Sequence, residues 1–115
     1  MSAPSAIFER FEVLVVPFPF TDRLASKKRP ALVLSNAAFN GTASHAVMAM
    51  ITSAEQSAWP NDVMIRDLDA AGLPNACVVR MKLFTLDARL VLRAAGRLSK
   101  RDSDAVEKSL RMILK

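Results

Sequence analysis

Residues 11–36 read FEVLVVPFPFTDRLASKKRPALVLSN, and this stretch decides the fold. Its first part, Phe11 to Val16, is short and rich in β-branched residues, which predicts a mostly buried strand. The prolines at 17 and 19 cannot donate to a ladder, so we expect the strand to end or to reach a sheet edge there. A polar, basic loop follows over residues 21–29. Residues 31–35 predict a second strand, in which Pro30 is acceptable at the first position.

Outward from this stretch, the chain predicts further short strands and one closing helix. Strands are predicted at about 45–51, 62–65 and 76–81, with weaker β patterns at 83–86 and 90–92, and with turns or loops at 36–42 and 52–61. Residues 68–71 predict one helical turn that Gly72 ends. From Ser99, capping-box spacing predicts an amphipathic helix whose apolar face holds Val106, Leu110, Ile113 and Leu114. We expect a loose tail over residues 1–6 and a single small α+β, barrel-like domain over 7–115.

Composition narrows the class of protein. Apolar residues make up 51% of the 115, so a compact core is possible without disulfides. The 16 basic residues exceed the 11 acidic ones, and this net charge of +5 favours an anionic partner such as nucleic acid. One cysteine and one histidine exclude an internal disulfide and a zinc site built without carboxylates. With no signal peptide and no membrane-length apolar run, we expect a cytoplasmic protein without membrane contact.

Five segments in order resemble the MazF/PemK family of toxins from type II toxin–antitoxin systems. They are Phe11–Asp22 (FEVLVVPFPFTD), Lys27–Asn36 (KKRPALVLSN), Met50–Ser53 (MITS), Cys77–Asp87 (CVVRMKLFTLD) and Ala95–Ser99 (AGRLS). The resemblance implies an SH3-like barrel with a C-terminal helix, a fold shared with the gyrase poison CcdB. It also implies a homodimer, and a cognate antitoxin that blocks the RNA groove and carries the toxin to operator DNA indirectly.

The activity that the resemblance implies is metal-independent and cofactor-independent cleavage of single-stranded RNA, as in mRNA interferases. Such an endoribonuclease uses the 2′-hydroxyl of the RNA itself and leaves a 2′,3′-cyclic phosphate and a 5′-hydroxyl. Metal-free cleavage needs a group that accepts the 2′-hydroxyl proton, one that stabilises the transition-state charge, and one that protonates the leaving oxygen. Arginine suits the second role because its planar guanidinium offers paired donors to phosphate oxygens.

Three residues match the catalytic positions of the family. Arg29 matches the arginine of the family's RP motif, Thr52 matches the threonine of its ITS segment, and Arg80 matches an arginine that acts as acid or clamp in some members. Lys82 stands where some relatives carry an acidic residue, so the resemblance leaves the general base open. His45 lies at the start of an apolar strand, and we expect it to be structural or solvent-facing rather than a base.

A second set is expected to bind RNA. Aromatic residues in long loops can stack unpaired bases, and loop cations hold phosphates without reading sequence. The expected set is Phe20, Thr21, Arg23, Lys27, Lys28, Ser53, Trp59 and Lys82. The alternatives are that Phe20 packs the barrel mouth, that Trp59 covers a hydrophobic edge, and that Arg29 with Lys27 and Lys28 forms a solvated basic loop. Cys77 begins an apolar strand and is expected to be a small, buried core residue.

Two other functions fit the same sequence. The first is a non-catalytic toxin that binds a protein target, as CcdB binds gyrase. It is favoured because position 82 is a lysine and not the acidic residue that some relatives carry there. A binding module that holds RNA or DNA without cleavage fits the basic charge. The presence of both Arg29 and Thr52 favours the ribonuclease, although one scaffold hosts many functions.

Overall fold

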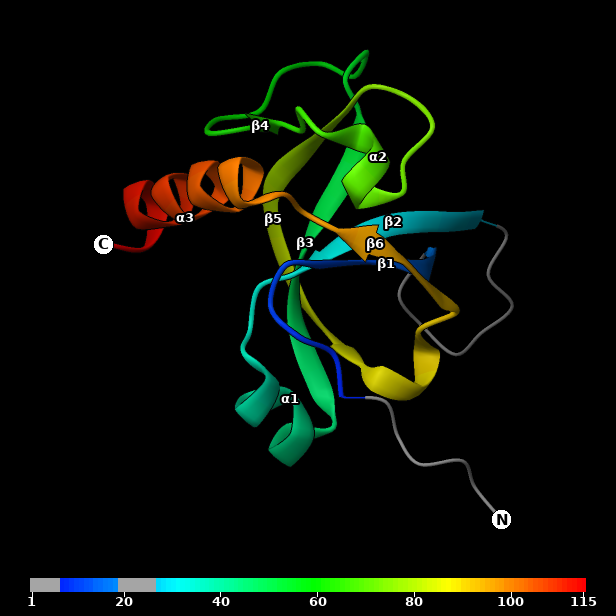
Figure 1. The fold of residues 1–115 in the computed structure, drawn as a ribbon. Helices are drawn as coiled ribbons and strands as arrows, with labels where there is room; N and C mark the ends of the chain where they lie inside the picture. Colours follow the sequence, from blue (N-terminus) through cyan, green and yellow to red (C-terminus); the bar gives the residue numbers. More distant parts are fainter. Residues whose placement is uncertain (1–6, 19–26) are drawn as a thin grey trace.

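The computed structural model describes residues 7–18 and 27–115; the expected tail at 1–6 and the expected RNA-binding residues Phe20, Thr21 and Arg23 lie outside the described residues. Within these ranges a curled, antiparallel, six-stranded sheet in the order β4-β5-β3-β2-β1-β6 carries the fold (Figure 1). The strands are β1 Glu12–Phe18, β2 Lys27–Val33, β3 His45–Ser53, β4 Val63–Met64, β5 Cys77–Asp87 and β6 Arg93–Arg97. The helices are α1 Ala37–Ala43, α2 Leu68–Ala71, the 3₁₀ turn η1 Ala88–Leu90 and α3 Lys100–Leu114. The prediction of a small barrel-like α+β fold with a C-terminal helix is confirmed.

The sheet is covered on both faces. On one face Val13, Ile51 and Val79 form a cluster with Val106 and Leu110 of α3. On the other face a second cluster is formed by residues that alternate with the first, among them Leu14, Val33, Met48 and Leu86. Burial on both faces explains why the central strands are nearly continuous apolar runs rather than alternating ones.

β1 continues through Pro17, where the sequence predicted that it ends or meets an edge. β6 pairs with β1 only from Glu12 to Val15, so beyond Val15 one side of β1 has no described partner strand. Pro17 pairs with Lys28 of β2 at this open part of β1. The edge interpretation is therefore confirmed, because a proline costs no ladder bond on an unpaired side.

β2 begins earlier than predicted. The ladder with β1 extends to Phe18 and Lys27, so Lys27, Lys28 and Arg29 lie in a strand and not in the expected loop. The prediction was wrong because charged residues disfavour a buried strand, whereas this part of β2 is exposed or half-buried.

The segment 36–42 was predicted as a turn, but it forms the short helix α1. The Asn36 side chain accepts a hydrogen bond from the amide of Phe39 at 2.9 Å and caps the first turn. Ser44, with a φ of 54°, ends the helix in a left-handed conformation. The residues that suggested a turn have other roles here. Asn36 caps the helix, Asn40 is buried, and Gly41 lies close to the Ile7 side chain.

β6 was not predicted, and the weak β pattern at 90–92 covers the last residue of η1 and the two residues that connect it to β6. The three central residues of β6, at 94–96, are small, and α2 lies against them. A Cβ added to Gly96 would meet the carbonyl oxygens of Ala70 and Ala71, and one added to Gly72 would meet that of Ala95. Gly72 itself has a φ of 72° and ends α2, as predicted.

α3 begins where the capping box predicted. Ser99 accepts a hydrogen bond from the amide of Asp102, and the buried carboxylate of Asp102 accepts bonds from the amides of Arg66 and Asp67. Of the predicted apolar face, Val106 and Leu110 are buried, whereas Ile113 and Leu114 are 39% and 68% exposed, so the last turn extends past the sheet. Across the described residues no helix is both long and apolar enough to span a membrane.

Candidate active site

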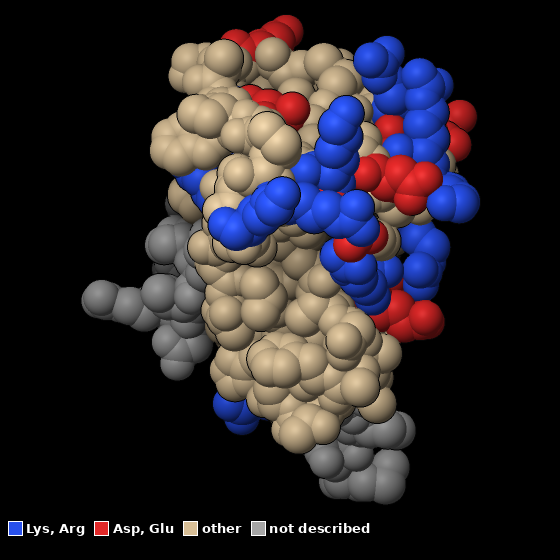
Figure 2. All heavy atoms as spheres, turned by 90° about the vertical axis from the view of Figure 1, so that its left-hand side faces the viewer, with Lys and Arg blue, Asp and Glu red and all other residues tan. Residues whose placement is uncertain are grey.

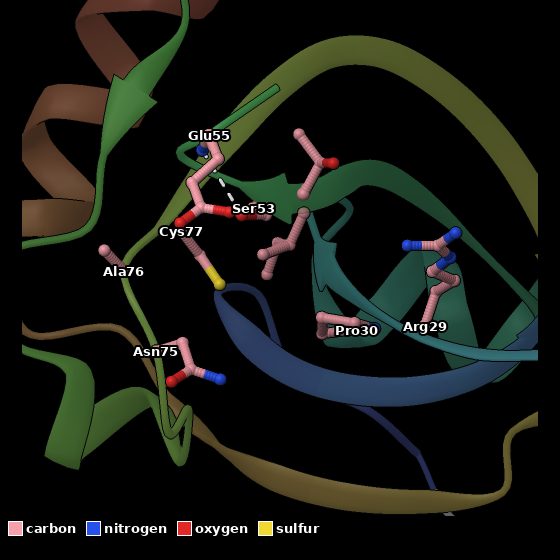
Figure 3. Close-up of a pocket in the computed structure, with 9 residues that line it drawn as sticks. Arg29, Pro30, Ser53, Glu55, Asn75, Ala76 and Cys77 are labelled. Atoms are coloured by element: carbon pink, nitrogen blue, oxygen red, sulfur yellow. Dashed lines mark hydrogen bonds between the residues drawn. The ribbon is translucent and has the colours of Figure 1, made fainter.

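β2 and β3 separate at the end of the sheet where Arg29 lies. Their ladder runs from Val33–Met48 to Ala31–Met50 and stops before Pro30, which has no amide hydrogen to donate. The gap opens a cavity of about 530 Å³, a size typical of small-molecule sites (Figure 3). It is lined by Arg29, Pro30, Ile51, Thr52, Ser53, Glu55, Asn75, Ala76 and Cys77.

Arg29 and Thr52 face each other across this gap. Continued by two residues beyond the last pair, Ala31 and Met50, the register brings Arg29 opposite Thr52 on one sheet face, and both residues line the cavity. The guanidinium carbon of Arg29 lies 5.5 Å from the ring centroid of Phe18, which is a cation–π contact with the flat face of the guanidinium group. None of the described carboxylates lies within ion-pair distance of Arg29, so its charge is not neutralised by any of them.

The opposite wall of the cavity comes from the end of β3 and the start of β5. The Glu55 amide donates to the Ser53 hydroxyl at 3.2 Å, and both residues lie with Cys77 across the cavity from Arg29 (Figure 3). Burial raises the pKa of the Cys77 thiol, although this side chain is half-buried and not the fully buried core residue expected. Glu55 and Asn75 were not foreseen, because both lie in irregular segments without periodicity or motif.

A second cavity of about 420 Å³ adjoins the first and shares Arg29, Pro30, Asn75 and Cys77 with it. It adds the cations Lys28 and Arg93. Among the described lining residues of the two cavities, three cations therefore oppose the single carboxylate of Glu55. This local excess attracts phosphate groups. The sequence did not identify Arg93 because it lies on the strand that was missed.

The face that carries α3 is different. Figure 2 shows Lys and Arg side chains mixed with Asp and Glu over its upper part. Two ion pairs neutralise part of this charge, Lys100–Asp104 at 3.0 Å and Arg10–Glu107 at 3.2 Å. Because carboxylates are interleaved with the cations on this face and two of the cations are paired, the joined cavities at the β2–β3 gap are the better candidate for binding a polyanion.

Arg80 does not line either cavity. It lies on β5 two residues from Val78, the partner of Thr52, and its side chain is only 10% exposed. Its Nε and Nη2 donate to the two carboxylate oxygens of Asp62 at 3.2 and 2.9 Å, and Nη2 also donates to the Ser57 carbonyl at 2.6 Å. The hydrogen bond to Asp62 raises the pKa of Arg80. Arg80 is therefore a buried arginine rather than a surface one, while its catalytic role stays a prediction.

Trp59 and Lys82 contact each other rather than the cavity. The Lys82 ammonium lies 4.4 Å from the centroid of the Trp59 ring, and Trp59 is 42% exposed. Lys27 and Lys28 are exposed at the start of β2, and Ser53 lines the cavity. Of the expected RNA-binding set, the structure thus brings Lys28 and Ser53 to the cavities and leaves Trp59 and Lys82 at a separate place.

His45 lies at the opposite end of β3 from Thr52. Its Nδ1 is 3.0 Å from the carbonyl oxygen of Ala43, and the ring is half-buried, which agrees with the expected structural role. Nowhere in residues 7–18 and 27–115 do three His, Cys, Asp or Glu side chains lie close enough to hold a metal ion together.

The curled antiparallel sheet with its C-terminal helix is the fold of the MazF toxins. A chain in a crystal structure of MazE–MazF from Deinococcus radiodurans is 22% identical, covers 95% of this chain and 97% of its own, and superposes with a TM-score of 0.76. Mycobacterium tuberculosis toxin MazF-mt6 is 17% identical, with 90% and 95% coverage and a TM-score of 0.71. A mycobacterial endoribonuclease in complex with its cognate antitoxin is 18% identical, with 94% and 93% coverage and a TM-score of 0.73.

A family model described as PemK-like, MazF-like toxin of type II toxin-antitoxin system matches residues 9–114. The chain therefore belongs to this toxin family. A search of the curated proteins found no match.

Proposed function

We propose that the protein is a metal-independent endoribonuclease that cleaves single-stranded RNA. The observation that carries the proposal is the position of Arg29 and Thr52, which face each other across the β2–β3 gap and line one cavity. These are the two positions for which the family resemblance implies catalysis. The open guanidinium and the cationic surroundings of the cavity support binding of a phosphodiester there.

In the proposed reaction the 2′-oxygen of one nucleotide forms a bond to the adjacent phosphorus, and the bond from phosphorus to the 5′-oxygen breaks. The 2′-hydroxyl proton leaves to a base and a proton is delivered to the departing 5′-oxygen, so the products are a 2′,3′-cyclic phosphate and a 5′-hydroxyl. Arg29 stabilises the charge that develops on the phosphate oxygens. The Thr52 hydroxyl donates a hydrogen bond that orients the same phosphate.

Neighbouring cations position the strand. Lys28 and Arg93 line the adjoining cavity, where they neutralise flanking phosphates. Lys27 extends this charge along β2, and Ser53 continues the lining beyond Thr52. Phe20, Thr21 and Arg23 belong to the proposed RNA-binding set as well.

The proposed partners follow from the relatives. MazF from Deinococcus radiodurans was solved with MazE, and a mycobacterial endoribonuclease with its cognate antitoxin. By analogy, a cognate antitoxin binds this chain, blocks RNA access to the cavity, and links the toxin to operator DNA indirectly. The active form is a homodimer in the cytoplasm.

The test is to incubate a mixed-sequence, single-stranded RNA with purified protein in EDTA and to map both ends of the products. The proposal requires cleavage that EDTA leaves intact, a 2′,3′-cyclic phosphate, and loss of cleavage in the folded Arg29→Ala variant. Cleavage that needs added metal contradicts it. So does intact RNA together with inhibition of gyrase supercoiling, which instead identifies a protein-binding toxin.

A further inference from the structure

The loop between β3 and β4 is held at several points although its residues are mostly exposed. Arg80 donates to the Ser57 carbonyl and to both carboxylate oxygens of Asp62. Asp62 accepts a further bond from the Trp59 amide at 3.1 Å, and the Asp62 amide donates to the Trp59 carbonyl at 3.2 Å. The backbone on both sides of Trp59 is thus fixed before any ligand arrives, which lowers the ordering cost of binding.

α3 adds an anchor to the same loop. The hydroxyl of Ser109, a buried residue of α3, donates to the Asn61 carbonyl at 2.6 Å. Asn61 has a φ of 63°, the left-handed region that asparagine tolerates better than most residues. The loop therefore turns sharply at Asn61 and is attached to two separate elements, β5 and α3.

A β-bulge places Lys82 over Trp59. Met50 of β3 pairs with Arg80, but the next residue, Ala49, pairs with Leu83, so Met81 and Lys82 have no partner on β3. Bulges change the direction of side chains and are frequent beside functional sites. Here the Lys82 ammonium lies 4.4 Å from the Trp59 ring centroid, although the ring is 42% exposed.

Sheet register relates this place to the candidate active site. Thr52 pairs with Val78 and Met50 pairs with Arg80, so Arg80 is the diagonal neighbour of Thr52 on the same sheet face. Arg29 faces Thr52 on that face. The order along one face is therefore Arg29, Thr52, Arg80 and then the loop that carries Trp59.

We propose that Trp59 and Lys82 form a nucleotide subsite that stacks one unpaired base and binds an adjacent phosphate, with Arg80 and Asp62 as positioning residues. The exposed indole supplies a flat surface for any base, and the ammonium supplies the charge that a phosphate needs. The subsite rests on the proposed function for its substrate, single-stranded RNA. It assigns to Lys82 a binding role at the position where some relatives carry an acid.

Trp59 is the only tryptophan in the sequence, so intrinsic tryptophan fluorescence reports on this subsite alone. The probe is a mixed-sequence, single-stranded oligonucleotide with 2′-O-methyl groups throughout, which cannot be cleaved by its own 2′-oxygen. We expect binding to quench the fluorescence. Trp59→Ala should raise the dissociation constant about 5- to 100-fold. Trp59→Phe should retain most of the affinity because it keeps an aromatic ring.

Two further variants separate stacking, phosphate binding and positioning. Lys82→Ala should lower the slope of log Kd against log salt by about 0.7, the value for one phosphate contact on a single strand. Arg80→Lys, which cannot bind Asp62 through two parallel bonds, should shift the Trp59 emission toward that of a fully hydrated indole and raise KM more than it lowers kcat. Phe39→Ala is the matched control, because Phe39 is 45% exposed on α1 at the other end of β3.

Saturable binding without quenching, or a Trp59→Ala affinity within twofold of the wild type, overturns the subsite. An equal loss in Phe39→Ala overturns it as well. Wild-type protein that binds the probe with quenching but cuts no RNA supports the subsite and refutes the ribonuclease. If the wild-type protein cuts RNA and the Trp59→Ala variant binds and cuts RNA equally well, the ribonuclease is supported and the subsite is refuted. The failure of the subsite and the failure of the ribonuclease are therefore distinguishable.

Discussion

Arg29 and Arg80 lie on the same sheet face, on either side of Thr52, but the protein uses their guanidinium groups differently. Arg80 directs three N–H bonds to Asp62 and Ser57, and its side chain is 10% exposed. Arg29 contacts the Phe18 ring and lines an open cavity, and no described carboxylate pairs with it.

The difference teaches that residue type and motif position do not set the role of an arginine. A buried guanidinium already bonded to a carboxylate stabilises the fold and has few donors left for a substrate. A guanidinium supported only through its flat face keeps its edge donors for an anion. The two arginines should therefore respond oppositely in stability and in activity.

The largest effect is expected for Arg80→Ala. Removal of the guanidinium leaves the Asp62 carboxylate, whose side chain is 18% exposed, without its partner. An uncompensated charge of this kind should lower the melting temperature by about 10 to 20 °C. Thermal unfolding followed by circular dichroism measures it. The double variant Arg80→Met/Asp62→Leu should recover much of the loss, and a single variant that melts within about 3 °C of the wild type would refute the clamp.

Arg29→Ala should lower the cleavage rate strongly and the stability only slightly, in contrast to Arg80→Ala. Loss of one donor that stabilises the transition state typically lowers kcat about 100- to 1000-fold, whereas the melting temperature should change by only about 3 °C or less. Single-turnover cleavage of RNA in EDTA measures the rate. Arg89→Ala is the control because its side chain is 85% exposed, and equal rate losses in both variants would contradict a specific role for Arg29.

Thr52→Val should give the next largest effect. This change keeps the shape of the side chain and removes a hydrogen bond to a charged phosphate, so kcat/KM should fall about 10- to 100-fold. Ser53→Ala is the comparison, and it should have the smaller effect because Ser53 lines the cavity but is not proposed to contact the phosphate that reacts. A larger loss of kcat/KM in Ser53→Ala than in Thr52→Val would assign the phosphate contact to Ser53 instead of Thr52.

Arg93→Ala tests the charge of the adjoining cavity rather than the chemistry. Arg93 is an exposed lining residue, and we expect it to hold a phosphate away from the bond that breaks. The slope of log Kd against log salt should decrease by about 0.7, with little change in kcat. Binding titrations at several salt concentrations measure this slope, and an unchanged slope would exclude the adjoining cavity from the RNA path.

The smallest effect is expected for the pair of Asp87 and Arg89, because the Arg89 side chain is 85% exposed whereas that of Arg80 is 10% exposed. Hydrogen bonds from Arg89 lower the pKa of Asp87 from 3.8 to about 2, so folding favours the ionised carboxylate. Its contribution to stability is therefore complete above about pH 4 and disappears as the pH falls through 2. Asp87→Asn should melt within about 2 °C of the wild type at pH 7, and the difference should shrink as the pH falls from 4 to 2. A loss as large as that of Arg80→Ala would show that burial does not distinguish the two pairs.

Sequence patterns predicted most of the sheet because strands and helix ends have local causes. The runs at 11–16, 31–35 and 45–51 are apolar and β-branched, and they form the centre of the observed sheet. The capping box at Ser99 and the stop at Gly72 are short-range hydrogen-bonding and backbone effects, and both were predicted correctly. β6 could not be predicted, since its small residues are explained by close contact with α2.

The site was predicted only in part for a similar reason. The family motifs indicated Arg29 and Thr52, but the gap that joins them arises where β2 leaves β3. Glu55, Asn75 and Arg93 enter the lining from segments far apart in the sequence, and no local pattern marks them. The bulge that places Lys82 over Trp59 depends on pairing between β3 and β5, which is a long-range property.

By itself the sequence determined the fold class, the family and the two residues most expected to act on RNA, because apolar periodicity, caps and motifs are encoded in neighbouring residues. Only the tertiary structure decided which cations remain open to a phosphate and which are bonded to a carboxylate. That distinction depends on distances between side chains from different strands and loops, and such distances exist only once the sheet has curled.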